Sequence, residues 1–171
     1  MQRSGSFSIT YGDGSKTSGP VYTDGVAVAG LSITNQTFSP VNVMSPSFAN
    51  PDGGSGYPAD GIAGMGFPAL SQTRSSPFFQ TLVSQHKVPA SIFSFRLASS
   101  SSELYLGGIN SNHYSGDLTY ATVTQKTYWT IGLGGVKVGN KAISIQGKAS
   151  VIDTGTTLVC ESNISSAPSL P

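Results

Sequence analysis

Asp153 is the residue of this chain whose surroundings most favour chemistry. It stands in segment 151–158, which reads V-I-D-T-G-T-T-L. The two apolar residues before the aspartate predict the end of a strand, and Gly155 permits a sharp turn because it lacks a Cβ. The threonine hydroxyls can donate hydrogen bonds, and such donors favour the ionised form of a carboxylate. Asp, Thr and Gly are also ordinary turn residues, so the tripeptide taken alone favours a plain turn.

Other short segments change this balance. An alternation of apolar and polar residues over 7–11 leads to Asp13-Gly14, a dipeptide typical of a hairpin tip. Glycines space an apolar stretch, D-G-I-A-G-M-G, over 60–66. Segment 104–118 contains L-Y-L-G-G-I-N and then Y-S-G-D-L, and Y-W-T-I follows at 128–131.

Taken in this order, the segments resemble those of the pepsin-like aspartic endopeptidases, in particular eukaryotic, fungal-type secreted acid proteases. I-T-Y-G-D-G-S resembles the active-site flap, and D-G-I-A-G-M-G resembles the segment that closes the amino-terminal lobe behind its catalytic loop. L-G-G-I-N and Y-S-G-D-L resemble the crossing between lobes, near Leu104 to Tyr114, and V-I-D-T-G-T-T-L resembles the second of two catalytic loops. The resemblance runs from about Ser6 to Val159. It implies an all-β fold with one or two short helices, as part of the bilobal pepsin-like acid protease architecture.

The resemblance also predicts how the chain is divided. Residues 1–103 would form most of an amino-terminal lobe with its flap, without that lobe's catalytic loop. Residues 104–159 would form the lobe crossing and the start of the carboxy-terminal lobe. The tail, 160–171, departs from the family pattern and is interpreted as read-through from an unremoved intron, and Met1 is interpreted as a mis-assigned start. We therefore expect the chain to be an internal piece of a longer enzyme.

Asp153 would be one of the two aspartates that activate a water molecule for peptide-bond hydrolysis at acidic pH. Thr154, Gly155 and Thr156 would support this catalytic loop, with Thr154 bonding across to its twin and Thr156 donating to the carboxylate. The family carries two Asp-Thr-Gly loops, whereas this sequence has one, and none of its other aspartates is followed by Thr-Gly or Ser-Gly. We therefore expect the isolated chain to be inactive and prone to aggregate.

The resemblance implies that substrate is bound by two loops and one apolar wall. The residues concerned are Tyr11, Gly12, Asp13, Ile62, Gly155 and Thr157. Tyr11 would close over the substrate, and Gly12 and Asp13 would bond to its backbone. A packed hairpin aromatic and plain turn chemistry are the alternatives for Tyr11 and Asp13. For Ile62 the alternative is a purely structural core role.

Two further functions compete with the two-lobed endopeptidase. One is a protease of the retroviral type, in which a single Asp-Thr-Gly suffices because two chains pair. In that family the Asp-Thr-Gly precedes the flap, whereas here it follows the flap. The other is a non-catalytic peptide-binding or inhibitory remnant of the fold. A serine hydrolase is not favoured, because Ser15 lacks the G-x-S-x-G elbow and a histidine partner.

Composition supports a turn-rich β protein and excludes several partners. The chain has 37% hydrophobic residues, 10% charged residues and 21 glycines. Its net charge of +1, without a basic run, leaves no electrostatic footprint for nucleic acid. No apolar stretch is long enough to span a bilayer. We expect a protein or peptide substrate as the partner, and complete family members are usually monomeric.

The sequence offers no candidate metal or cofactor site. Cys160 is the only cysteine, and His86 and His113 lack metal-ligand spacing, so both histidines are expected at the surface. No cofactor is expected. The resemblance implies a secreted, extracellular or vacuolar protein. Asn35-Gln36-Thr37 and Asn163-Ile164-Ser165 fit the N-glycosylation sequon.

Local patterns predict the remaining elements. Ser76 as N-cap and Pro77 at the first helical position predict a helix with positive charge in its C-terminal turn. Its apolar stripe comprises Phe78, Phe79, Leu82 and Val83, and its basic end comprises His86 and Lys87. Short strands are expected over 21–43, with breaks at Asp24-Gly25 and Asn35-Gln36. A loop is expected over 47–58, and a strand over 92–97 ends in a hairpin tip at 99–102.

Overall fold

The computed structural model describes residues 1–49, 60–145 and 147–156. The chain divides into two compact units, Met1–Asp117 and Leu118–Pro171. Strands dominate both units and the helices are short, so the expected all-β class is confirmed. Within the described ranges, no helix has both the length and the apolar character needed to cross a membrane.

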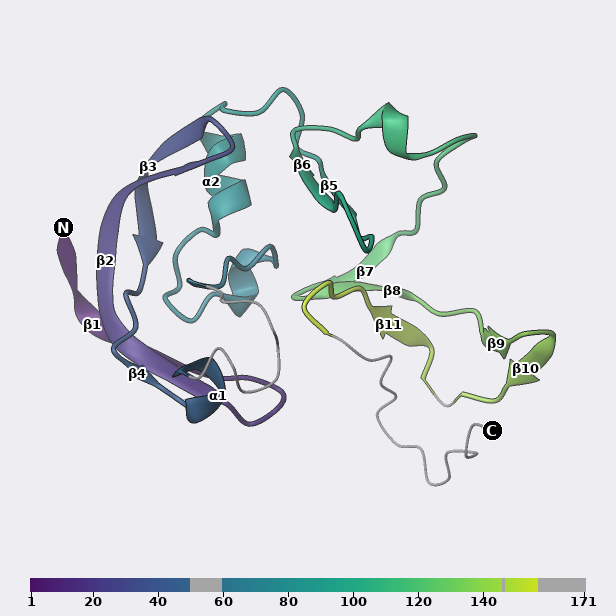
Figure 1. Ribbon diagram of the computed structural model, residues 1–171, viewed down its shortest axis with the longest axis horizontal. Coiled ribbons are helices and arrows are strands. Elements are labelled where there is room, and N and C mark those ends of the chain that lie inside the picture. The colour runs from purple at the N-terminus through teal and green to yellow at the C-terminus, as the bar shows by residue number, and fades with distance from the viewer. Residues whose placement is uncertain (50–59, 146, 157–171) are drawn as a thin grey trace. The chain divides into compact units, whose positions relative to one another are not determined.

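The first unit is built around one long central strand (Figure 1). β2 (Lys16–Val28) pairs antiparallel with β1 (Gln2–Thr10) on one side and β3 (Leu31–Phe38) on the other. Near its start, β2 also pairs with the short strand β4 (Val43–Met44). β1 and β2 form a hairpin in which Thr10 pairs with Lys16, which confirms the predicted tip at Asp13-Gly14.

The predicted strand breaks at Asp24-Gly25 and Asn35-Gln36 are wrong, because β2 and β3 both continue through them. The register passes from the pair Asp24–Gln36 to the pair Val26–Ile33, so two residues of β3 face the single residue Gly25. This two-against-one arrangement is a β-bulge. The Asp24 carboxylate accepts the Gly25 N–H at 2.8 Å, so the Asp-Gly turn chemistry is used within a continuous strand.

Helix α2 (Phe78–Ser84) packs against β3 and supplies most of the core of this unit. Ile33 is 2% exposed, Phe79 5% and Leu82 0%. Phe78 and Val83 pack partly buried against this cluster, so the predicted apolar stripe is confirmed. Figure 1 shows α2 beside β3.

Both predicted ends of this helix need correction. The N-cap is Pro77, whose carbonyl accepts the Thr81 N–H at 3.0 Å, and no side chain caps the helix. Ser76 lies one residue before this cap, and its carbonyl accepts the Gln36 amide at 3.1 Å. The helix stops at Ser84 with Gln85 as C-cap, so the basic pair 86–87 follows the last turn without belonging to it.

The predicted loop over 47–58 begins with a helical turn instead. α1 (Pro46–Ala49) follows β4, and the Phe48 N–H donates to the Ser45 carbonyl at 2.9 Å. A proline at the first helical position favours such a turn because its missing N–H is not needed there. Residues 50–58 of the predicted loop lie outside the described residues. A second short helix, η1 (Pro68–Leu70), is of the 3-10 type.

Gly19 of β2 lies against a neighbouring backbone. A Cβ at this position would lie 2.7 Å from the Pro40 carbonyl oxygen and 2.8 Å from the Val41 Cα. Distances this short are incompatible with any side chain unless backbone atoms move. Glycine at position 19 therefore allows segment 40–41 to pass close along β2, between the residues that pair with β3 and those that pair with β4.

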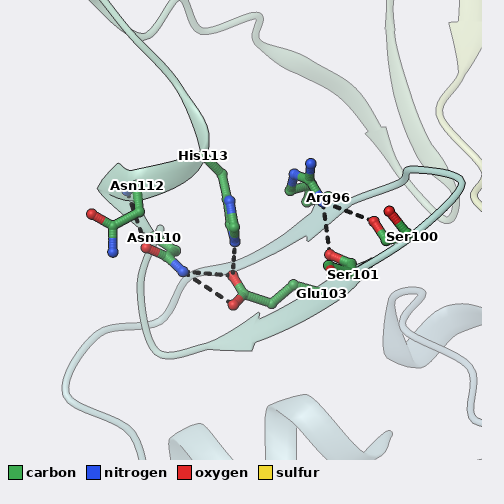
Figure 2. Close-up of polar contacts among 7 residues, drawn as sticks. All are labelled: Arg96, Ser100, Ser101, Glu103, Asn110, Asn112 and His113. Atoms are coloured by element: carbon green, nitrogen blue, oxygen red, sulfur yellow. Dashed lines mark hydrogen bonds and ion pairs between the residues drawn. The ribbon is translucent and has the colours of Figure 1, made fainter.

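The end of the first unit is organised by a polar cluster (Figure 2). β5 (Phe93–Arg96) and β6 (Glu103–Leu106) form the predicted hairpin, and Arg96 donates to the carbonyls of its tip at 2.7 and 3.3 Å. The Glu103 carboxylate accepts the Asn110 amide at 3.0 and 3.1 Å and lies 3.4 Å from the His113 Nε2. Asn110 also accepts the Asn112 N–H at 3.1 Å and so caps η2 (Ser111–His113). His86 and His113 are both exposed, as predicted.

The second unit contains the strand that leads to Asp153. β8 (Trp129–Gly132) pairs antiparallel with β7 (Val123–Lys126) and with β11 (Ala149–Val151), giving the order β11-β8-β7. β9 (Val136–Val138) and β10 (Lys141–Ile143) form a separate hairpin. Thr130, at the centre of β8, is 8% exposed.

Candidate active site

The Asp153 loop starts directly from the end of β11. The Ile152 N–H donates to the Trp129 carbonyl at 3.0 Å, which extends the pairing with β8 by one residue beyond Val151. Asp153 is the next residue, so its backbone leaves the sheet from an anchored position. The apolar residues before the aspartate therefore end a strand, as the sequence predicts.

Both oxygens of the Asp153 carboxylate accept hydrogen bonds from its own loop. The Gly155 N–H donates to Oδ1 at 2.9 Å, and the Thr156 hydroxyl donates to Oδ2 at 2.6 Å. Hydrogen bonds to an ionised group are the shorter and stronger kind, and two of them fix the plane of the carboxylate. The carboxylate remains exposed, so its other lone pairs are accessible to solvent.

The geometry gives a specific reason for the glycine in this loop. A Cβ built on Gly155 would lie 3.2 Å from Asp153 Oδ1, and its φ lies outside the left-handed region. A side chain at position 155 would therefore press on the Asp153 carboxylate, whereas the backbone angle does not by itself favour glycine. Thr154 is exposed beside it. Thr157 lies outside the described residues.

The hairpin tip at 11–15 is closed by its own hydrogen bonds. The Tyr11 N–H donates to the Ser15 carbonyl at 2.8 Å, and the Gly14 N–H donates to the Tyr11 carbonyl at 3.0 Å. Asp13 Oδ1 accepts the Ser15 hydroxyl at 2.6 Å and the Ser15 N–H at 2.9 Å. These two bonds, the hydroxyl first, lower the pKa of Asp13 from its ordinary value. Turn chemistry therefore engages one oxygen of Asp13, while the other oxygen and the Gly12 backbone are exposed.

Tyr11 has an aromatic neighbour that the sequence did not indicate. Its ring centroid lies 5.3 Å from that of Phe48, with the planes tilted by 59°. Ser45, just before α1, accepts the Lys16 N–H on its hydroxyl at 2.8 Å and donates its own N–H to the Lys16 carbonyl at 2.9 Å. The base of the hairpin is thus bound to the segment that carries Phe48. The contact joins residues 37 positions apart, and no local pattern signals it.

The predicted site residues fall into two groups. Asp153, Gly155 and Thr156 are brought together in the second unit, and Tyr11, Gly12 and Asp13 are brought together in the first. Ile62 also belongs to the first unit, where it is 65% exposed and lies outside the buried cluster of the described residues. Within the described ranges, no three His, Cys, Asp or Glu side chains gather where they could hold a metal ion.

The sequence is similar to known proteolytic enzymes over nearly its whole length. The family profile described as eukaryotic aspartyl protease matches residues 1–167. An aspartic protease of Phaffia rhodozyma is 53% identical over 158 residues, which is 92% of this chain and 38% of that protein. Cathepsin E of Cavia porcellus is 37% identical over 90% of this chain, and pepsin A of Sus scrofa is 38% identical over 89%. The chain spans 39% of the length of each of these two relatives.

Proposed function

The chain belongs to the eukaryotic aspartyl protease family, and from this premise we propose that it supplies the flap and one of the two catalytic aspartates of an acid endopeptidase. The observation that carries the proposal is the geometry of Asp153. Its carboxylate stands at the end of β11, exposed, with both oxygens oriented by the loop's own donors at 2.9 and 2.6 Å. Asx turns such as that of Asp13 hold a carboxylate in a similar way, so the exposed Asp153 supports the proposal together with its Asp-Thr-Gly context in a chain of this family.

In the proposed reaction, Asp153 and a second aspartate hold one water molecule between them. Two carboxylates this close share a proton, so one serves as base and the other as acid. The ionised carboxylate takes a proton from the water, and the hydroxyl oxygen forms a bond to the carbon of the peptide carbonyl. The protonated carboxyl gives its proton to the carbonyl oxygen. The tetrahedral intermediate then collapses: one of its hydroxyl protons passes to the second carboxylate, the C–N bond breaks, and the leaving nitrogen takes the proton that the first carboxylate removed from the water.

The second aspartate of this pair is not assigned to any residue of the present sequence. Asp153 is the only aspartate here that is followed by Thr-Gly or Ser-Gly, and the chain spans 38% of the length of its relative from Phaffia rhodozyma. We propose that the other catalytic loop, the first of the family's two, is contributed by a part of the whole protein beyond these residues. The isolated chain of 171 residues is then expected not to cleave peptides.

The remaining residues act on the substrate rather than on the water. Tyr11 covers the bound peptide, and its contact with Phe48 at 5.3 Å supports the ring from one side. Gly12 and the free oxygen of Asp13 bond to the peptide backbone. Ile62 offers an exposed apolar surface to a substrate side chain.

Two further contacts are proposed for the catalytic loop. Gly155 and Thr157 meet the substrate main chain, and Thr154 bonds to its counterpart in the other catalytic loop. We further propose that the lobes divide between residues 104 and 114, that the complete enzyme acts as a monomer, and that it is secreted or vacuolar.

The proposal is tested by a chimera with the Phaffia rhodozyma protease, whose aligned segment is 53% identical to this chain. This chain replaces that segment, and cleavage of haemoglobin is measured at acidic pH. Asp153→Asn should lower turnover by at least about 100-fold, because an amide cannot serve as acid or base. Asp117→Asn is the matched control, since Asp117 is also exposed but belongs to neither group of site residues.

Three outcomes discriminate between the functions. Loss of cleavage in Asp153→Asn, with Asp117→Asn unaffected, supports the endopeptidase. A chimera that binds a statine-type inhibitor but cleaves nothing would instead indicate a peptide-binding remnant. A soluble 171-residue chain with proteolysis that Asp153→Asn abolishes would indicate an enzyme that needs only two copies of this chain.

A further inference from the structure

The bulge in β3 displays one asparagine to solvent between anchored neighbours. Ile33 and Gln36 are buried, at 2% and 8% exposure, whereas the two residues between them are both exposed. A regular strand alternates its side chains between faces, so two successive exposed residues are a consequence of the bulge. The second of them, Asn35, has a φ of +56°.

The neighbours of Asn35 are all engaged in contacts. Thr34 donates its N–H to Gln85 Oε1 at 3.0 Å, and its carbonyl accepts Gln85 Nε2 at 2.8 Å. Gln36 donates to the Ser76 carbonyl at 3.1 Å, while Ile33 packs in the core. The side-chain amide of Asn35 makes no hydrogen bond within the described part of the chain. This amide can therefore carry a large substituent without displacing any contact that holds β3.

We propose that Asn35 is a site of N-linked glycosylation. Asn35-Gln36-Thr37 fits the acceptor sequon, in which the middle residue is any except proline. In the transfer, Asn35 Nδ2 forms a bond to C1 of the first sugar of a lipid-diphosphate-linked oligosaccharide. The bond from C1 to the diphosphate breaks, and the proton lost by the amide leaves with the lipid diphosphate. A glycan of this kind is bulky and solubilising, which suits an exposed position.

The glycan would lie far from the flap. Gly25, which faces the bulge, is nine residues along β2 from Lys16 at the base of the hairpin tip. At about 3.3 Å per residue this separation reaches about 30 Å along the strand. We therefore expect modification of Asn35 to leave the flap undisturbed.

The left-handed backbone angle at position 35 also favours asparagine, so the test must separate this backbone preference from glycosylation. Asparagine adopts left-handed backbone angles more readily than most residues, so the bulge alone would favour it. The backbone angle depends only on which residue stands at position 35, whereas the glycosylation sequon also requires the hydroxyl of Thr37. Substitutions at Thr37 therefore address the glycan without touching the bulge. This inference relies on the secretory route included in the proposed function, and the experiment supplies that route with a foreign leader.

The full chain is expressed behind a secretory leader in a eukaryotic host, in an Asn163→Gln background that removes the other sequon. Intact mass is measured before and after a peptide N-glycosidase, which converts a glycosylated asparagine to aspartate. We expect the glycan in this background and in Thr37→Ser, and its loss in Thr37→Val. Asn35→Asp, which keeps the size of the side chain and tolerates the same backbone angle, should also lack it, which provides a second variant if Thr37→Val is not secreted.

An unmodified Asn163→Gln protein, in a host that glycosylates a control protein, would overturn the proposal. So would a glycan that persists in Thr37→Val or in Asn35→Asp. The outcome is distinguishable from that of the proposed function, because it is read as mass and not as cleavage. The chimera adds one check: Asn35→Asp should leave its rate of haemoglobin cleavage within a factor of two, and a larger loss would place Asn35 in the catalytic machinery instead.

Discussion

Leu82→Ala should remove a large part of the stability of the first unit. Leu82 is 0% exposed and packs with Ile33 and Phe79 where α2 meets β3. The substitution deletes three buried carbon atoms, worth about 0.8 kcal/mol each, or roughly 2.4 kcal/mol in transfer free energy. The cavity left behind adds to this, so we expect a total loss of about 3 to 4 kcal/mol. Since whole domains are stable by about 5–15 kcal/mol, the loss is a substantial fraction.

The chain offers a chemically identical control. Leu97 is 67% exposed, so Leu97→Ala deletes the same atoms from a surface position and should change stability by less than about 0.5 kcal/mol. The assay is urea unfolding of the chimera with the Phaffia rhodozyma protease, followed by far-ultraviolet circular dichroism, with the free energy taken from the midpoint and slope. Hydrogen exchange of the α2 amides gives a local readout of the same contact. Loss of less than about 1 kcal/mol in Leu82→Ala, or equal losses in both variants, would refute the placement of the core.

Three further predictions concern the site. The complete enzyme should be most active at acidic pH and be blocked by statine-type inhibitors, because one carboxylate of the pair must hold a proton; maximal cleavage above neutral pH would contradict this. Tyr11→Ala should lower turnover only in part, since it loosens the flap without removing the chemistry, whereas Tyr11→Phe keeps the ring contact with Phe48 and should stay closer to the wild-type rate in haemoglobin cleavage. Ser15→Ala should raise the pKa of Asp13 toward its ordinary value of 3.8, as followed by NMR titration, because the Ser15 hydroxyl is the main group that lowers it. Because the pKa of Asp13 is lower in the folded state, this turn stabilises the fold above pH 3.8 and loses that contribution as the pH falls through the folded pKa; an unchanged titration in Ser15→Ala would contradict the assignment.

Local sequence patterns predicted the elements whose signals are local. The alternation before Asp13-Gly14 gave the β1–β2 hairpin, the apolar stripe from Phe78 to Val83 gave α2, and the apolar pair before Asp153 gave the end of a strand. Each of these depends on residues within a few positions of one another. The hydrogen bond from the Thr156 hydroxyl to the Asp153 carboxylate was also predicted, whereas the bond from the Gly155 N–H was not.

The predictions that failed depended on partners distant in sequence. Asp24-Gly25 has the composition of a turn, yet pairing with β3 on both sides of it keeps β2 continuous through a bulge. Ser76 has the side chain of an N-cap, but the helix is capped at Pro77, and the Ser76 carbonyl bonds to Gln36, 40 residues earlier. The contact of Tyr11 with Phe48 also joins segments that only the fold brings together. A local sequence pattern reflects the conformational propensity of its residues, whereas these features depend on contacts between residues distant in sequence.

The close approach at Gly19 has a consequence for how this sequence can vary under selection. An added Cβ would meet backbone atoms at 2.7 and 2.8 Å at Gly19, whereas at Gly12, in the flap, it would meet nothing within 4 Å. A saturation library selected only for folding should therefore keep glycine at position 19 and accept other residues at position 12. A library selected for cleavage should keep both, since Gly12 is proposed to bond to the substrate. The difference between the two libraries would separate residues that shape the scaffold from residues that meet the ligand.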